Sequence, residues 1–285
     1  MTIDELRNEI DKIDNEMKSL FVQRMGVSKQ ISDIKAASGA DIYNPEREKE
    51  IIEKRSSDID ESIKNEYISM VKNVIGLSRK YQYRNIMEKN GNELDIDYIE
   101  IEPKAQNAAA LKSELYIIDS ISKDSIHTVD DHRQLSEIVM SGKCNVGISV
   151  METIGKNVSN GFHKLLIHNP LYINRCDIVE DGEYRKKVVT FSRDLVILPK
   201  HNRIKLMFVC ENKCSGLASL LSVISDYGVE ISGIHTVPFI DSVWNYVFML
   251  ELKGSLLDKN TRTCIYQMMR EADEFKILGS YTCTE

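Results

Sequence analysis

Arginine, lysine and neutral hydrogen-bonding side chains recur in the first 90 residues. Arg24 and Lys35 are 11 residues apart, about three helical turns, so a helix places them on one face. Arg24 also interrupts an apolar seam, and a charge buried there needs a partner because unpaired charges are costly to bury. The wider set is Arg7, Arg24, Lys35, Arg47, Glu48, Ser78 and Gln82. The set contains cations and neutral hydrogen-bond donors but almost no nucleophile or base. It therefore indicates a binding site for a small polyanion whose reaction needs no proton transfer.

Arg7 stands apart from this set. It precedes Arg24 by 17 residues, about 25 Å along a straight helix, so the two cannot hold one small ligand from the same helix. If Arg7 is functional, it serves a site in a second chain, which predicts an intertwined helical dimer. Ser78 and Gln82 are four residues apart and share one helix face.

These side chains need long helices to position them. Apolar residues recur at alternating spacings of three and four, which predicts a first helix about 30 residues long. This seam consists of Ile3, Leu6, Ile10, Ile13, Met17, Leu20, Val27, Ile31 and Ile34. Asn44-Pro45 is typical of an N-cap and a first-turn proline, so we expect a short helix over 45–56. Its positive end favours an anion beside Arg47 and Glu48. A third helix is expected over 61–88.

The remaining chain divides into two further segments, which gives predicted domains at 1–88, 89–202 and 203–285. Residues 89–202 begin with a polar linker and predict a short α/β module. Its expected strands are 115–118, 146–150, 171–179 and 195–198, with helices around 132–140 and 157–166. Residues 203–285 predict a βαββαβ, ferredoxin-like order. Its strands are 204–210, 229–236, 244–252 and 275–281, and its helices 215–227 and 258–271.

Composition narrows the function classes. The 285 residues are 42% hydrophobic and 28% charged, a globular balance, and the net charge of −7 argues against nucleic acid as a partner. No apolar run reaches the roughly 20 residues that cross a membrane. The charged N-terminus is unlike a signal peptide. Six scattered cysteines, with only Cys210 and Cys214 close together, predict no metal site. We therefore expect a cytoplasmic protein with reduced thiols and no cofactor.

Residues 1–85 resemble the AroQ-type chorismate mutases, an all-α family of three-helix chains that pair as intertwined dimers. The matching segments are LRNEIDKIDNEM, FVQRMGVSKQISDIK, IYNPEREKEII and IGLSRKYQ. The resemblance implies conversion of chorismate to prephenate in the biosynthesis of phenylalanine and tyrosine. This reaction is a pericyclic rearrangement of one molecule, so it needs a fixed conformer and stabilisation of charge on an ether oxygen.

The same resemblance implies roles for the individual residues. Arg7 of a neighbouring chain and Arg24 would bind substrate carboxylates, with Arg47 supporting them. Lys35 and Gln82 would donate to the ether oxygen, and Lys35 would also contact a carboxylate. The ring-hydroxyl side would be formed by Glu48, which accepts from the hydroxyl, and by Asn44, which stands where some members carry Asp. Ser78 would complete the side of the third helix.

Residues 203–281 resemble the ACT regulatory domain that ends prephenate dehydratases. KLMFVCENKCSGLASLLSVISDYGVEISGIHTVP and VWNYVFMLEL carry this resemblance. It implies an amino-acid effector, usually phenylalanine, bound between paired domains. The candidate residues are Cys214, Ser215, Gly216, Leu217 and His235. The family's Glu-Ser-Arg-Pro motif reads His235-Thr236-Val237-Pro238, which leaves open another ligand or a purely structural dimer contact.

The middle segment resembles part of a prephenate dehydratase domain. CNVGISVMETIGKNVSNGFHKLL retains Glu152 and Gly155 of the family pattern, and Ser192 stands where the family has a catalytic Thr. The segment that carries Ser192 follows this stretch after few residues, whereas the family inserts a second lobe there. We therefore expect an inactive dehydratase-like module. The leading hypothesis is therefore a chorismate mutase that forms a homodimer or homotetramer. The alternatives are a bifunctional mutase and dehydratase regulated by phenylalanine, and a non-catalytic regulatory binding protein.

Overall fold

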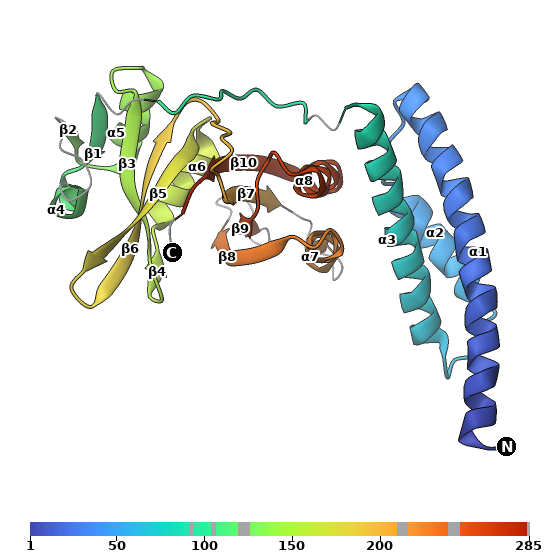
Figure 1. The fold of residues 1–285 in the computed structure, drawn as a ribbon. Helices are drawn as coiled ribbons and strands as arrows, with labels where there is room; N and C mark the ends of the chain where they lie inside the picture. Colours follow the sequence, from blue (N-terminus) through green and yellow to red (C-terminus); the bar gives the residue numbers. More distant parts are fainter. Residues whose placement is uncertain (92–93, 104–106, 119–125, 210–215, 239–245, 284–285) are drawn as a thin grey trace. The chain divides into compact units, whose positions relative to one another are not determined.

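The computed structural model describes residues 1–91, 94–103, 107–118, 126–209, 216–238 and 246–283, except for the side chains of two strand-end residues. The chain divides into two compact units, Met1–Glu93 and Leu94–Glu285. Each unit is described by itself (Figure 1). Among the described residues, no helix is long and apolar enough to cross a membrane.

The described part of the first unit is helical. It consists of α1 (Ile3–Ser38), α2 (Pro45–Ser56) and α3 (Lys64–Lys89). Thr2 and Glu5 form a capping box at the start of α1, and Gly39 ends this helix with a φ of 69°, which suits a residue without a Cβ. The Asn44 side chain accepts a hydrogen bond from the Arg47 backbone at the start of α2. The long, short, long pattern expected from the sequence is confirmed.

The apolar seam of α1 is open to solvent in both halves of the helix, as far as the described residues show. Its seam residues are exposed, for example Ile3 at 68% and Leu20 at 64% of their surface. The second half packs along α3, which supplies most buried apolar side chains of this unit, including Val71, Tyr83 and Met87. The face of α1 that contacts α3 is therefore not the face that carries the seam, because Val27, Ile31 and Ile34 in the second half are also 42–69% exposed.

The second unit is built on one continuous sheet. Its strand order is β2-β1-β3-β6-β5-β10-β7-β9-β8, with β4 paired to β3. The first elements are β1 (Ala108–Leu111), a 3-10 turn (Lys112–Glu114), α4 (Leu115–Ile118), β2 (Ile126–Val129), α5 (His132–Met140), β3 (Val146–Thr153) and β4 (Asn157–Val158). They are followed by α6 (Asn160–His168), β5 (Tyr172–Asp181) and β6 (Tyr184–Ser192).

The βαββαβ order expected after residue 203 is present. It comprises β7 (Arg203–Val209), α7 (Gly216–Asp226), β8 (Glu230–Pro238), β9 (Tyr246–Lys253), α8 (Lys259–Glu271) and β10 (Glu274–Tyr281). Gly279 of β10 pairs with Ile173 of β5, so these strands extend the sheet of the preceding segment. Residues 94–285 therefore form one compact unit, and the domain division at residue 203 stays a prediction.

The alternation of strand side chains builds a core on each face of this sheet. Met207 and Val209 of β7 lie in a core that includes residues of α5 and α6. The intervening Leu206 and Phe208 lie in a second core, which includes residues of α7 and α8. Helices from the two parts of the unit therefore cover opposite faces of β7.

Two strand expectations in the middle segment are wrong. Residues 115–118 form α4, in which Ile117 and Ile118 are both buried, because a short apolar run suits a helix turn as well as a strand. Residues 195–198 form only a single bridge, between Val196 and Ile99. The helix expected from 157 begins at Asn160, after the short strand β4.

Candidate active site

Arg24 is a half-buried cation of α1 that reaches α3. Its Nη1 donates to the Val74 carbonyl at 3.2 Å and to the Ser78 hydroxyl. Burial lowers the pKa of Arg24, and the charge of Arg55 lowers it further. Among the described residues, no carboxylate forms an ion pair with Arg24. A bound anion beside the guanidinium would therefore offset both the burial of its charge and its repulsion by Arg55.

Lys35 lies in the last turn of α1, where the chain bends toward α2. Its Nζ donates to the backbone carbonyls of Asp41 at 2.8 Å and Ile42 at 3.0 Å. Burial lowers the pKa of Lys35, while the charges of Asp41 and Glu48 act in the opposite direction. An ammonium has three N–H donors, so one remains for a ligand.

Glu48 of α2 is held by Arg79, a residue that the sequence analysis missed. The Arg79 Nη1 donates to both Glu48 oxygens, at 2.7 and 2.5 Å, and the guanidinium lies 4.7 Å from the centre of the Tyr43 ring. Both side chains of the ion pair are largely buried, with 11% and 21% of their surfaces exposed. The available signal was the spacing, because Arg79 precedes Gln82 by three residues and so shares its helix face.

Ser78 and Gln82 of α3 are both buried. The Ser78 hydroxyl donates to the Val74 carbonyl at 3.0 Å while it accepts from Arg24. The Gln82 Oε1 is buried and has no hydrogen-bond partner among the described residues. An unpaired buried polar atom costs free energy, and an amide can offer N–H donors as well as an acceptor to a ligand.

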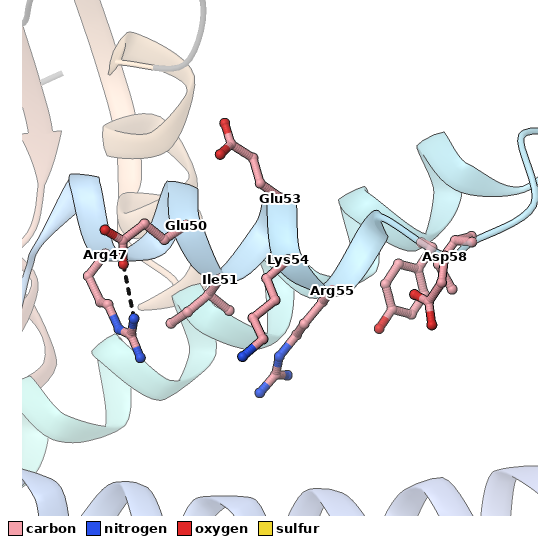
Figure 2. A pocket seen from close by; sticks show the side chains of 9 residues that line it. Arg47, Glu50, Ile51, Glu53, Lys54, Arg55 and Asp58 are labelled. Carbon is pink, nitrogen blue, oxygen red and sulfur yellow. Dashed lines mark hydrogen bonds and ion pairs between the residues drawn. The ribbon is translucent and has the colours of Figure 1, made fainter.

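Arg47 and Asn44 lie at the start of α2 but make local contacts. The Asn44 oxygen caps the helix, and Arg47 forms a 3.0 Å ion pair with Glu50. A hollow of about 890 Å³ beside α2 is lined by Arg47, Glu50, Ile51, Glu53, Lys54, Arg55, Asp58, Ile59 and Tyr67. In Figure 2 the Arg47, Lys54 and Arg55 side chains point to one side of α2, whereas Glu53 points away. The hollow is thus rich in cations on one side.

Arg7 is not brought to these residues within one chain. Its side chain is 73% exposed and pairs with Asp4 at 3.2 Å, in the first half of α1. The structure therefore brings Arg24 together with Ser78, and Glu48 together with Arg79. It leaves Arg7 on a separate surface.

The candidate effector residues are only partly described. Cys214 and Ser215 lie outside the described residues, and the half-buried Gly216 and Leu217 begin α7. The His235 ring on β8 is half-buried, with its centre 6.1 Å from that of His163. Burial lowers the pKa of His235, and the charge of Lys205 lowers it further.

The dehydratase-like residues are already satisfied by neighbours. Glu152 pairs with Lys187 at 3.3 Å, and the same ammonium contacts Glu251 at 3.1 Å. The Ser192 hydroxyl is 1% exposed and hydrogen-bonds the Asn174 amide at 2.6 Å. Gly155 forms a turn with a φ of 73°. Both Glu152 and Ser192 therefore already have polar partners among the described residues.

Comparisons with known proteins agree with the two-part organisation. Residues 6–83 match the family described as chorismate mutase type II. The bifunctional chorismate mutase/prephenate dehydratase of Aquifex aeolicus is 20% identical over 358 aligned residues, which cover 97% of each chain. This alignment is longer than the present chain, so the relative carries residues without a counterpart here. The chorismate mutase of Methanocaldococcus jannaschii is 36% identical over 64 residues, 21% of this chain and 65% of the relative.

Solved structures show the fold of the second part. Prephenate dehydratase from Streptococcus mutans aligns with a TM-score of 0.53 and 14% identity, over 62% of this chain and 97% of the other. The Arthrobacter aurescens prephenate dehydratase in complex with L-Phe aligns with a TM-score of 0.55 and 11% identity, over 62% and 90% of the chains. The chain thus carries a chorismate mutase type II domain in residues 6–83, fused to a segment with the fold of prephenate dehydratases.

Proposed function

We propose that this protein is a chorismate mutase that converts chorismate to prephenate, and that its dehydratase-like segment is inactive. The observation that carries the proposal is Arg24. Its guanidinium is half-buried at the α1–α3 contact, beside Ser78 and near a second cation, without a carboxylate partner among the described residues. A dicarboxylate substrate supplies the missing negative charge. The type II family match over residues 6–83 supports this choice of substrate.

The proposed mechanism uses positioning and electrostatics alone. Arg24 binds one carboxylate of chorismate, with Arg47 on the same side. The unused N–H of Lys35 and the buried amide of Gln82 donate to the ether oxygen, which becomes more negative as its bond to carbon breaks. Glu48, fixed by Arg79, accepts from the ring hydroxyl. Holding the reactive conformer accounts for the rest of the rate gain, and no group has to exchange a proton.

We propose that the site is completed by a second copy of the chain. The exposed seam on the first half of α1 needs a partner surface, and Arg7 lies on this half. An α1 helix from a second copy laid against α2 would bring Arg7 of the partner subunit to the carboxylates. The assembly is then a homodimer through the helical unit, or a homotetramer if the βαββαβ segments also pair.

The proposal of an inactive dehydratase-like segment depends on Glu152 and Ser192. A catalytic carboxylate must face substrate, but Glu152 is engaged by Lys187. Ser192 is buried against Asn174. The greater length of the Aquifex relative over the same alignment is compatible with the loss of a second lobe in this chain.

We further propose that residues 203–285 are an ACT-type regulatory domain for an amino acid. The βαββαβ order and the start of α7 at Gly216 fit this assignment. The L-Phe complex of the Arthrobacter prephenate dehydratase makes phenylalanine the first ligand to test. His235 occupies the position of the family's Glu in the motif at the end of β8, the second strand, so a His235 substitution is the variant that tests ligand binding at this position.

The deciding experiment measures chorismate loss by the purified chain, with prephenate and phenylpyruvate quantified separately. Lys35→Met is the site variant, and Lys143→Met, which changes an exposed lysine of the second unit, is the matched control. We expect prephenate to accumulate without phenylpyruvate, and the rate to fall roughly 100–1,000-fold only in Lys35→Met. Phenylpyruvate formed at neutral pH would establish the bifunctional alternative. No chorismate loss would favour a regulatory binding protein.

A further inference from the structure

Two cysteines face each other where the two parts of the second unit join. Cys176 lies in β5. Cys283 lies two residues after the end of β10 and pairs with Cys176 in a parallel β-bridge. Their Sγ atoms are 3.7 Å apart, and only 3% and 4% of the two residues is exposed. The backbone on both sides is held in place, because Cys176 N donates to the Thr282 carbonyl and Cys283 N to the Asn202 side chain.

This geometry suits a disulfide. Opposite residues on neighbouring strands lie about 4.8 Å apart, inside the range of Cα separations that a disulfide requires. Forming the bond requires the Sγ–Sγ distance to shorten from 3.7 Å to about 2.05 Å, a change that side-chain rotation serves. Of the other described cysteines, Cys144 lies in the same core as the pair and Cys264 lies in the core on the other face of the sheet. Of the described cysteines, only Cys176 and Cys283 form such a pair.

The surroundings give the two thiols different reactivity. The hydrogen bond with Cys176 lowers the pKa of Cys283, and the charges of Lys187 and Arg203 add to this effect against burial and Glu251. The same hydrogen bond, together with burial, raises the pKa of Cys176. The nearby cations Lys187 and Arg203 favour Cys283 as the thiolate that attacks an oxidant, with Cys176 as the thiol that resolves the product.

We propose that Cys176 and Cys283 form a reversible, peroxide-driven disulfide that joins the end of β10 to β5. The Cys283 thiolate attacks one oxygen of hydrogen peroxide, the O–O bond breaks, and a sulfenic acid and hydroxide form; the hydroxide takes up the proton that Cys283 had released and becomes water. The Cys176 sulfur then attacks the sulfenic sulfur, its proton leaves with the departing hydroxyl as a second water, and the S–S bond forms. Two thiols are oxidised while one peroxide is reduced to two waters.

The position of the bond gives it a structural consequence. β5 and β10 are the strands through which the βαββαβ segment continues the sheet. A disulfide here closes a loop between residues that are 107 apart in the chain. Oxidation therefore fixes this junction covalently, and we expect it to raise the melting temperature of the second unit by roughly 10 °C.

The test uses the full chain, reduced and then exposed to hydrogen peroxide. Remaining thiols are blocked under denaturing conditions before intact-mass measurement and peptide mapping. We expect a product lighter by two hydrogen atoms, with the Cys176 and Cys283 peptides joined, and its reversal by dithiothreitol. Cys144→Ser, which changes another buried thiol, should retain the cross-link, and Cys283→Ser should lose it.

A second variant tests the order of the steps independently. In Cys176→Ser the sulfenic acid at Cys283 has no resolving thiol, so it should accumulate and react with dimedone. The proposal is overturned if peroxide adds oxygen atoms to these cysteines without joining them. It is also overturned if the cross-link maps to other cysteines, or if both thiols stay unreacted in the folded chain.

Discussion

Replacing Arg24 by Met should separate activity from stability. In the free protein the guanidinium makes two hydrogen bonds, to the Val74 carbonyl and the Ser78 hydroxyl, worth about 1 kcal/mol each. Burial and Arg55 both disfavour its charge, which offsets part of this gain. We therefore expect the free energy of unfolding to fall by less than about 2 kcal/mol. The substrate carboxylate instead loses its cation, so kcat/KM should fall about 100–1,000-fold, equivalent to roughly 2.7–4 kcal/mol.

The matched variant is Arg79→Met, which removes a different arginine from the same site. Here the loss leaves the Glu48 carboxylate largely buried without its partner, and both side chains of the pair are less than one-quarter exposed. Breaking such a pair costs about 3 kcal/mol, near the lower bound for buried pairs because some solvent remains. Urea unfolding followed by circular dichroism, together with chorismate loss at saturating and limiting substrate, measures both quantities for both variants.

Two results would refute this reasoning. Arg24→Met with unchanged kcat/KM would show that the guanidinium does not bind substrate. Arg24→Met destabilised as strongly as Arg79→Met would show that Arg24 is a structural residue, and that any rate loss reflects unfolding. Arg133→Met, on the exposed surface of α5, controls for the loss of an arginine as such and should change neither measurement.

Further predictions concern pH and packing. Burial lowers the pKa of Lys35, so kcat/KM should fall with rising pH before the ordinary lysine range near 10.5, and a flat profile would contradict its role as a charged donor. Burial raises the pKa of the Glu251 carboxyl, but the charges of Lys187 and Lys205 outweigh the effect of burial and lower this pKa to about 2. Glu251 therefore contributes stability above its unfolded pKa of about 4.5, about 3 kcal/mol, which is lost as pH falls toward 2. The difference in unfolding free energy between wild type and Glu251→Gln should narrow over that range. Gly279→Ala should destabilise the second unit by about 3 kcal/mol or more, because its Cβ would meet the backbone of β5. Gly155→Ala, which meets no atom within 4 Å, should cost only about 1–2 kcal/mol for its positive φ, as denaturant unfolding would show.

Helices and strands whose apolar residues follow one clear spacing were predictable from the sequence. The helices of the first unit follow from three–four spacing and from the Asn44-Pro45 start signal. The βαββαβ order follows from strands and helices that alternate cleanly. In the middle segment the helix expected over 132–140 and the strands expected at 146–150 and 171–179 are present, whereas other elements of its sheet were not predicted. β1 is largely a run of alanines, Ala108–Ala110, which have weak strand preference, and its neighbours in the sheet fix its conformation.

The residues of the candidate site were likewise predictable only where a sequence pattern marked them. Arg24 stood out because it breaks an apolar pattern, and the structure gives it partners on α3. Arg79 could not be distinguished from the solvated basic residues around it, since only the tertiary contact with Glu48 buries its charge. Arg7 is exposed and pairs only locally with Asp4 among the described residues, so the role expected for it requires a second copy of the chain.

The continuity of the sheet through β5 and β10 has a consequence for how the second unit folds. The pairing joins Ile173 to Gly279, so β5 cannot gain this neighbour until the last strand has been made and positioned. Such distant contacts are formed late, because a long loop must close before they contribute stability. Until then both strands present open edges, which are templates for association between chains. We therefore expect the second unit to unfold in one cooperative transition and to refold slowly, and expression of residues 203–285 alone to yield aggregates.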